Sequence, residues 1–412
     1  MAFQYDVRKT PGDTSWFTSD RFGMFIHWGL YAMPARHEWV KNNERMTDER
    51  YARYFEHFNP DLYDPEAWAR EAKNAGMKYA VLTAKHHEGF CLFDSRHTDY
   101  KAANTPCGRD LCREYVEAFR AQGLRVGFYY SLLDWHHPDY TVDRCHPQRD
   151  EPDRAARNAG RDMKRYAQYM RDQVTELLTN YGKIDILWFD FSFEDKGKDD
   201  WEAEKLIETA RGLQPHLIID NRTQIEQDLW TPEQEQPREW VRDSEGRRVV
   251  WELCQTFSGS WGYHREESSW MSDEMLVRML VNTVSCGGNL LLNVGPTARG
   301  YLDSRAVSAL RAIGEWMKYN APSVYGCTQA EYTPPADVRY TRKENRLYAH
   351  LFAYPYKKLL LPGLAGKAAY VQFLHDGSEL FFRDTDGGLE IDLPRVQPAQ
   401  LVPVVEIILS ED

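Results

Sequence analysis

The sequence predicts an α/β chain: a (β/α)₈-like barrel over residues 1–321, followed by a small antiparallel β domain over residues 322–412. Two observations predict the barrel. Short apolar runs alternate with longer amphipathic stretches through the first three-quarters of the chain, which is typical of βα units. These runs all fall within about 300 residues, a length that suits a single closed barrel.

The predicted strands of the barrel are seven apolar runs. They lie at 22–28, 79–83, 126–130, 184–190, 217–220, 249–253 and 289–294. A closed barrel of this type has eight strands. We therefore expect one further strand whose apolar pattern is too weak to be recognised.

The helices between these strands have recognisable ends. Asp64, Asp110 and Ser272 each stand directly before an amphipathic stretch, where their side chains can cap the first turn. Gly76 and Gly123 stand where two of these stretches end, and glycine readily adopts the left-handed conformation that stops a helix. The pattern therefore predicts helices on the connections between strands.

The C-terminal quarter has a different pattern. After a predicted helix at 303–319, no helical period is found. Short segments such as RLYAHLFA and AAYVQFLHDG alternate in polarity and are separated by turn dipeptides. We expect an antiparallel β domain that begins near residue 322.

Composition excludes several classes of partner. The chain has 412 residues, 51 Lys and Arg against 63 Asp and Glu, and a formal net charge of −12. This balance, without a cluster of basic residues, argues against a nucleic-acid partner. No apolar stretch approaches the roughly 18 residues of a membrane span, so no membrane partner is expected. The first residues lack the apolar core of a signal peptide, and seven scattered cysteines without a CxxC pair indicate reduced thiols, so a cytoplasmic location is expected.

Polar side chains gather at the carboxyl ends of the predicted strands. His27 ends the first strand, His86 and His87 follow the second, and Asp190 ends the fourth, while Tyr129 lies within the third. In a parallel barrel these ends form one face, which is where barrel enzymes hold their catalytic groups. The sequence therefore predicts one cleft on this face.

Asp190 is the strongest candidate for chemistry. An acid at the end of a buried apolar strand is costly unless it has a partner or a function. The two-residue period of a strand places Trp188 and Asp190 on one side and Phe189 on the other. An aromatic surface beside a carboxylate suits a sugar, although Asp190 could also act as the N-cap of a following helix.

Glycoside hydrolysis needs a second carboxyl group. The candidates after the fifth predicted strand are Glu226, Glu233, Glu235, Glu239 and Glu252. Spacing does not choose among them, and most glutamates in a polar loop are simply solvated. If Glu233 is the acid/base, we expect burial to raise its pKa toward the working pH, while Arg222 and the histidines keep Asp190 ionised.

The histidine pairs allow an alternative. The pairs at 86–87 and 136–137, with Asp134 and Asp139, are ligand types that could hold Zn²⁺ or Mn²⁺. There is no HExxH motif, and a neutral imidazole can equally bind a sugar hydroxyl or be a structural histidine. The segment GGNLLLNVGP matches neither nucleotide-binding loop, so no nucleotide cofactor is expected.

Seven stretches of the chain resemble α-L-fucosidases of glycoside hydrolase family 29. They are WFTSDRFGMFIHWGLYAMP, the EW pair at 38–39, AGMKYAVLTAKHHEGFCLFDS, GFYYSLLDWHHPDY, DILWFDFSF, WELCQTFSGSWGYH and LVNTVSCGGNLLLNVGPTARG. They occur in the family's order between about residues 15 and 300. The resemblance implies a TIM-type barrel followed by a β-sandwich, and a retaining mechanism with no metal or cofactor.

The resemblance also implies roles for particular residues. Asp190 matches the nucleophile, and Glu233 matches the acid/base of the broad-specificity branch, with Glu235 and Glu252 as alternatives. The residues that match sugar-binding positions are His27, Glu38, Trp39, His86, His87, Tyr129, Trp188, Arg222 and Trp261. On residues alone, Glu38 reads more simply as a surface acid beside a core tryptophan.

We therefore expect a retaining exo-glycosidase that removes terminal α-L-fucose from oligosaccharides or glycoconjugates. Two alternatives come from other classes: a metal-dependent barrel hydrolase that uses the histidine pairs, and a non-catalytic fucose-binding protein. Within the enzyme class, L-galactose differs from fucose only by an added hydroxyl, which a hydrophobic pocket rejects weakly. The chain is compatible with a homo-oligomer, and its sequence does not give a number of subunits.

Overall fold

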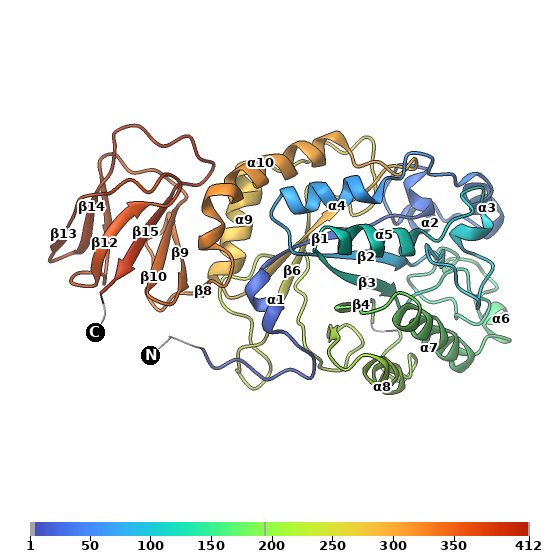
Figure 1. Cartoon of the computed structure of the whole chain (residues 1–412). Coiled ribbons are helices and arrows are strands. Elements are labelled where there is room, and N and C mark those ends of the chain that lie inside the picture. The colour runs from blue at the N-terminus through green and yellow to red at the C-terminus, as the bar shows by residue number, and fades with distance from the viewer. Residues whose placement is uncertain (1–4, 193–194, 411–412) are drawn as a thin grey trace.

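The computed structural model describes residues 5–192 and 195–410. Its larger part is one sheet of parallel strands flanked by helices (Figure 1). In pairing order the strands are β5 (Ile218–Ile219), β4 (Ile186–Asp190), β3 (Arg125–Ser131), β2 (Tyr79–Lys85), β1 (Phe22–Ile26), β7 (Asn289–Val294) and β6 (Glu252–Thr256). This confirms the predicted α/β fold class, in the form of an incompletely closed barrel.

One predicted strand is displaced along the chain. The run 249–253 is expected to be a strand, but β6 begins only at Glu252, where its pairing with β7 starts. The preceding residues pair elsewhere: the Trp230 N–H donates to the Val250 carbonyl over 3.0 Å. The apolar run reflects the burial of Val249, Val250 and Trp251. Burial alone does not make a strand, so the run predicts the position of the strand imprecisely.

The weak eighth strand corresponds to the segment 229–233. Three isolated parallel bridges join Asp220 to Leu229, Trp230 to Trp251 and Glu233 to Cys254. The segment therefore lies between β5 and β6 and partly closes the barrel. It escapes the hydrophobic pattern because it reads LWTPE, and proline cannot donate to a strand ladder. Glu233 lies at its carboxyl end.

The helices begin and end largely where the sequence predicted. The Asp64, Asp110 and Ser272 side chains each accept a backbone N–H at the start of α4, α5 and α9. Gly76 and Gly123 follow α4 and α5 with φ values of 88° and 75°. The helices are α1 (Ser15–Asp20), α2 (Val40–Asn43), α3 (Asp48–His57), α4 (Pro65–Asn74), α5 (Leu111–Ala121), α6 (Arg154–Asn158), α7 (Met163–Thr179), α8 (Ala203–Leu213), α9 (Asp273–Ser285) and α10 (Ser304–Asn320), with short 3₁₀ turns at Leu30–Ala32, Ala102–Asn104 and Ala321–Ser323.

Side chains of β4 alternate between two cores, as its period predicts. Leu187 and Phe189 belong to the large core shared with the helices. Ile186 and Trp188 belong to a smaller cluster inside the barrel, which also contains Tyr129. The inner cluster forms the floor on which the carboxyl-end side chains stand.

The C-terminal part consists of two antiparallel sheets around their own core. One sheet contains β12 (Ala368–Phe373), β15 (Val404–Leu409), β10 (Arg346–Leu351), β9 (Val338–Lys343) and β8 (Thr328–Gln329); the other contains β11 (Lys358–Leu361), β14 (Gly388–Asp392) and β13 (Phe382–Thr385). These sheets lie beyond α9 and α10, away from the carboxyl ends of the barrel strands (Figure 1). The indole N–H of Trp316 in α10 donates to the Val402 carbonyl over 2.8 Å and joins the two parts.

Two further sequence features can be compared with the structure. All seven cysteines are free thiols. Within residues 5–192 and 195–410, no helix has the length and apolar composition needed to cross a membrane.

Glu252 at the start of β6 generates a stability prediction. Its side chain is fully buried inside the barrel and accepts a hydrogen bond from the Tyr79 hydroxyl, and burial raises its pKa from 4.5 to about 8. The folded protein therefore holds this proton up to about pH 8, whereas the unfolded chain releases it near its ordinary pKa. Between these two pKa values only the unfolded chain ionises Glu252, so the free energy of unfolding falls as the pH rises through this range.

We expect Glu252→Gln, which cannot ionise, to remove this loss. The difference in unfolding free energy, variant minus unsubstituted protein, should increase by about 1 kcal/mol or more when the pH is raised from 5.5 to 8.5. Denaturant unfolding at both pH values measures this gain. An equal difference between the two proteins at both pH values would contradict the assignment.

Candidate active site

The carboxyl ends of the strands surround one pocket of about 140 Å³. Drug-sized ligands occupy roughly 300–1,000 Å³, so this pocket suits a single small ring. All eleven residues singled out from the sequence line it. The full lining is Phe25, His27, Glu38, Trp39, His86, His87, Tyr129, Trp188, Asp190, Phe191, Arg222, Glu233, Cys254 and Trp261.

Asp190 lies in the pocket with both carboxylate oxygens engaged. The Tyr129 hydroxyl donates to Oδ2 over 2.7 Å, and Arg222 Nη1 donates to Oδ1 over 2.8 Å. Burial and the neighbouring Asp190 hold the pKa of Tyr129 well above its usual range, so the phenol keeps its proton as a donor. The helix-cap alternative for Asp190 is wrong, because α8, the next helix, begins only after Glu202.

The residue after Asp190 has an unusual backbone. Phe191 has a φ of 83°, a left-handed conformation that costs a bulky residue about 1–3 kcal/mol. Its ring packs 5.4 Å from the Trp39 ring and 5.0 Å from the His87 ring, measured between centroids. These contacts hold the chain as it turns away from β4, so the carboxylate points inward.

Glu233 shares a partner with Asp190. The same Arg222 Nη1 that binds Asp190 lies 2.8 Å from Glu233 Oε2. The expected burial of Glu233 is wrong: its side chain is 43% exposed, against 12% for Asp190. It stands at the pocket mouth because the segment 229–233 ends there.

The other candidate glutamates lie elsewhere. Glu252 is at the opposite end of the barrel strands, bonded to Tyr79. Glu226 forms an ion pair with Arg8. Glu235 and Glu239 are exposed and do not line the pocket.

Arg222 is held over the barrel interior. Its guanidinium lies 4.6 Å from the centroid of the Trp188 ring, and its Nε donates to Thr231 Oγ1 over 3.0 Å. Burial lowers the pKa of Arg222, whereas Asp190 and Glu233 raise it, and the net shift is upward. The guanidinium therefore stays charged between the two acids.

His27 has a defined tautomer. Asn293 Nδ2 donates to the Trp261 carbonyl over 2.7 Å, so Asn293 Oδ1 faces His27 Nδ1, 2.6 Å away. His27 Nδ1 must then carry the proton, which leaves Nε2 as an acceptor without a hydrogen-bond partner among the described residues. Burial and His86 hold the pKa of His27 well below its usual range. This neutral ring can accept a hydrogen bond from a ligand hydroxyl.

Asn293 is a functional candidate that sequence reasoning misses. It lies near the carboxyl end of β7 and links two pocket residues, His27 and Trp261. The signal is present, because a polar residue near the end of an apolar strand is the same pattern that identifies Asp190. The glycines and proline around Asn293 suggest a comparison with nucleotide-binding loops, and that comparison does not identify the asparagine as a site residue.

The two histidine pairs have different surroundings. The rings of His86 and His87 lie 4.0 Å apart between centroids and line the pocket. His136 instead stacks on Tyr100, and Asp134 forms an ion pair with Lys85. Across the described ranges, no group of three or more His, Cys, Asp or Glu side chains is arranged to hold a metal ion.

Glu38 is buried, so its interpretation as a surface acid is wrong. It is 2% exposed, and its Oε2 accepts the backbone N–H groups of Trp261 and Gly262 over 3.1 and 2.8 Å. Glu38 therefore holds the Trp261 loop from the pocket side.

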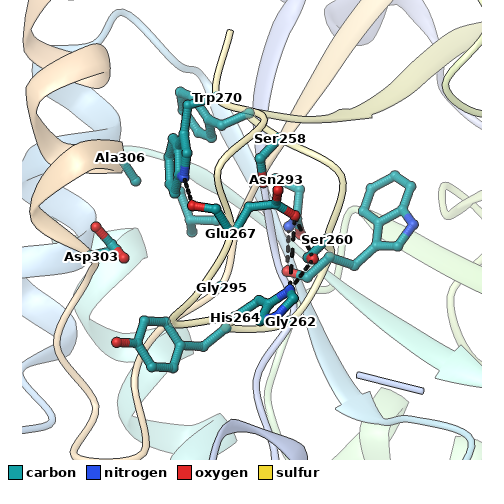
Figure 2. Close-up of a pocket in the computed structure, with 14 residues that line it drawn as sticks. Ser258, Ser260, Gly262, His264, Glu267, Trp270, Asn293, Gly295, Asp303 and Ala306 are labelled. Atoms are coloured by element: carbon teal, nitrogen blue, oxygen red, sulfur yellow. Dashed lines mark hydrogen bonds and ion pairs between the residues drawn. The ribbon is translucent and has the colours of Figure 1, made fainter. Parts of the chain in front are cut away.

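The far side of the Trp261 loop is also braced. Figure 2 shows Ser260, His264 and Glu267 close together and joined by dashed lines. Ser260 Oγ donates to Glu267 over 2.9 Å and lies 3.2 Å from His264 Nδ1. Hydrogen bonds, the strongest from the Ser269 hydroxyl, lower the pKa of Glu267 to about 2, so it remains an anion that orders the loop.

Comparison with known proteins agrees with this geometry. A family model described as α-L-fucosidase matches residues 4–322, and one described as the α-L-fucosidase C-terminal domain matches residues 331–407. The plasma α-L-fucosidase of Rattus norvegicus is 30% identical over 96% of this chain and 90% of its own length.

Solved structures are similar over nearly the whole chain. α-L-Fucosidase isoenzyme 1 from Paenibacillus thiaminolyticus is 47% identical, with a TM-score of 0.93 over 97% of this chain and 99% of that one. A GH29 α-L-fucosidase from Bacteroides thetaiotaomicron, solved as a trapped covalent intermediate, is 28% identical, with a TM-score of 0.86 over 100% and 98%. The chain therefore belongs to the α-L-fucosidases of glycoside hydrolase family 29, and it is a glycoside hydrolase.

Proposed function

We propose that the protein removes terminal α-L-fucose from oligosaccharides or glycoconjugates with retention of configuration. One observation carries this proposal: Arg222 Nη1 lies 2.8 Å from an oxygen of Asp190 and 2.8 Å from an oxygen of Glu233. Those two oxygens are therefore no more than twice 2.8 Å apart. Retaining enzymes separate their carboxyl groups by roughly 5–5.5 Å and inverting enzymes by roughly 6.5–9.5 Å, so the spacing supports double displacement.

In the first step Asp190 attacks the anomeric carbon and Glu233 protonates the departing oxygen. The glycosidic bond breaks as an ester bond forms between fucose and Asp190. The buried position of Asp190, with Tyr129 and Arg222 as donors, keeps it oriented for attack. The more exposed Glu233 stands where the leaving group departs, and there it can exchange its proton with water.

In the second step Glu233 takes a proton from water, which attacks the same carbon and releases Asp190. Two inversions at one carbon leave its configuration unchanged. Two of the residues that hold the ring, His27 and His87, do not titrate near neutral pH. Burial, followed by the neighbouring His86, holds the pKa of His27 and of His87 well below the usual range, so both bind hydroxyls as neutral rings.

Replacing the proposed nucleophile gives the most direct test. We expect Asp190→Ala to lower kcat on an aryl α-L-fucoside by about a thousandfold or more, because no covalent intermediate can form. Added azide should restore turnover by occupying the vacated space and attacking the anomeric carbon. The product is then the β-fucosyl azide, which NMR identifies. Activity close to that of the unsubstituted enzyme would refute the role.

Replacing the proposed acid/base should give a result that depends on the leaving group. Glu233→Gln should lower kcat/KM by about a hundredfold or more for a sugar leaving group, which needs a proton. The loss should be far smaller for 2,4-dinitrophenyl fucoside, which departs without one. Glu235→Gln, a matched change on the exposed loop, is the control and should alter neither. Equal losses on both substrates by Glu233→Gln would exclude the assignment.

Asn293 offers a test of how His27 is held. We expect Asn293→Ala to lower kcat/KM by about tenfold or more, because His27 and Trp261 lose a shared partner. Asn293→Asp should also shift the acidic limb of the kcat/KM profile to higher pH. The new carboxylate favours imidazolium at His27, and imidazolium cannot accept from a hydroxyl. If both variants lost activity with an unchanged pH profile, the tautomer argument would fail.

A further inference from the structure

We propose that Glu88 holds His86 as an imidazolium, so that this ring donates a hydrogen bond from Nε2 to a hydroxyl of the sugar. Glu88 acts through His86 and is therefore a positioning residue for the reaction. This inference rests on the proposed function. It gives His86 the opposite role to His27, whose Nε2 is an acceptor.

Glu88 is a buried acid without a hydrogen-bond donor. Its exposed fraction is 1%, and neither carboxylate oxygen makes a hydrogen bond with the residues that the structure describes. An isolated ionised carboxylate in such a place costs several kcal/mol, so it needs a cation beside it. His86 Nδ1 lies 3.5 Å from Glu88 Oε2, and no other Lys, Arg or His nitrogen of the described chain is within ion-pair distance.

The hydrogens on the His86 ring follow from this pairing. Its Nδ1 is buried and makes no hydrogen bond in the described part of the chain, so Glu88 is its one polar neighbour. A neutral ring with its hydrogen on Nδ1 would leave the negative charge of Glu88 uncompensated. An imidazolium cancels that charge and carries a hydrogen on both nitrogens. Imidazole is a stronger base than a carboxylate, so the shared proton stays on His86. Nε2–H is then left for the fucose pocket, which the ring lines.

The groups around Glu88 add no second charge. Tyr31, Tyr51 and Tyr100 lie near it, and burial, followed by the charge of Glu88, holds the pKa of each phenol well above its usual range. These phenols therefore remain neutral. The positive charge that balances Glu88 has to come from His86.

The groups around His86 also fit a cation. Its ring lies within 18° of parallel to the Tyr129 ring, 5.6 Å away between centroids, and an aromatic face stabilises a positive charge at that range. The other titratable neighbours are His27 and His87. Burial, followed by the charge of His86, holds the pKa of both well below the usual range, so one cation stands beside two neutral rings.

His87 shows why a nearby carboxylate is not sufficient. Its Nε2 lies 3.9 Å from Asp190 Oδ2, but that carboxylate already accepts hydrogen bonds from Tyr129 and Arg222. Asp190 therefore does not need a charged histidine, whereas Glu88 has no other donor.

The pocket thus holds histidines with different hydrogen-bonding roles. His27 accepts from a hydroxyl, and His86 donates to one with a full positive charge. Hydrogen bonds from charged donors are roughly twice as strong as neutral ones. A sugar turned the wrong way would place its hydroxyl hydrogens and lone pairs against the wrong rings, so the two histidines favour one orientation.

Nitrogen NMR measures the charge of His86 directly. In protein labelled with ¹⁵N-histidine, the two ring nitrogens of an imidazolium resonate close together, whereas those of a neutral ring are widely separated. At about pH 6 we expect the imidazolium pattern for His86 and the neutral pattern for His27 and His87. His86→Gln assigns the signals by removing them. In Glu88→Gln the His86 signals should change to the neutral pattern, because the buried ring loses its counter-charge.

Kinetics separate the charge of Glu88 from its size. Glu88→Gln keeps the size and loses the charge, whereas Glu88→Asp keeps the charge on a shorter side chain. We expect Glu88→Gln to lower kcat/KM for an aryl α-L-fucoside by about tenfold or more, and Glu88→Asp to remain at least about threefold more active than Glu88→Gln. Glu406→Gln, the same change at another buried acid, is the matched control and should alter neither kcat/KM nor the His86 signals.

The outcomes distinguish this inference from the proposed function. A neutral pattern for His86 in the unsubstituted protein would overturn the inference, and so would higher activity of Glu88→Gln than of Glu88→Asp. Thermal unfolding checks each variant, and if Glu88→Gln does not fold, the spectrum of the unsubstituted protein still decides. Failure of that protein to cleave any α-L-fucoside would overturn the proposed function, whereas the spectrum reports on the Glu88–His86 pair independently of activity.

Discussion

One guanidinium between two carboxylates is the interaction on which the rest of the site depends. Two carboxylates this close repel each other when both are ionised, unless a positive charge lies between them. Arg222 binds both and remains charged because both raise its pKa. The guanidinium packs on the Trp188 ring, which belongs to the inner core of the barrel, and this contact helps to hold Arg222 between the two acids. Arg222 therefore fixes how close the two carboxylates lie to each other.

The two acids come from strands of very different regularity, and the less regular one is the segment 229–233. Asp190 ends a well-formed strand, whereas Glu233 ends a segment held by three isolated bridges. A regular strand at that position would carry more ladder hydrogen bonds and leave its end less exposed. The irregular segment places Glu233 at the pocket mouth, where solvent can reach it. The strained Phe191 backbone shows a similar local cost beside Asp190.

The rest of the pocket is held in place by hydrogen bonds from neighbouring segments. Glu38 and Asn293 hold the Trp261 loop through its backbone, and the loop has its own network on the far side (Figure 2). Asn293 also fixes the proton on His27. Burial, followed by the neighbouring His86, holds the pKa of His27 and of His87 well below the usual range, so both rings are neutral. Preorganised groups of this kind favour one sugar orientation.

The sequence by itself determined the strand ends and their polar residues. Period and apolar runs are local properties, so they suffice to place Asp190, His27 and the histidine pair at 86–87 on one face of the barrel. Only the tertiary structure decided which glutamate joins them. Glu233 and Glu252 look alike in sequence, but the folded chain buries Glu252 at the opposite end of the barrel. The eighth strand also needed the fold, because it depends on contacts between segments that carry no periodic signal.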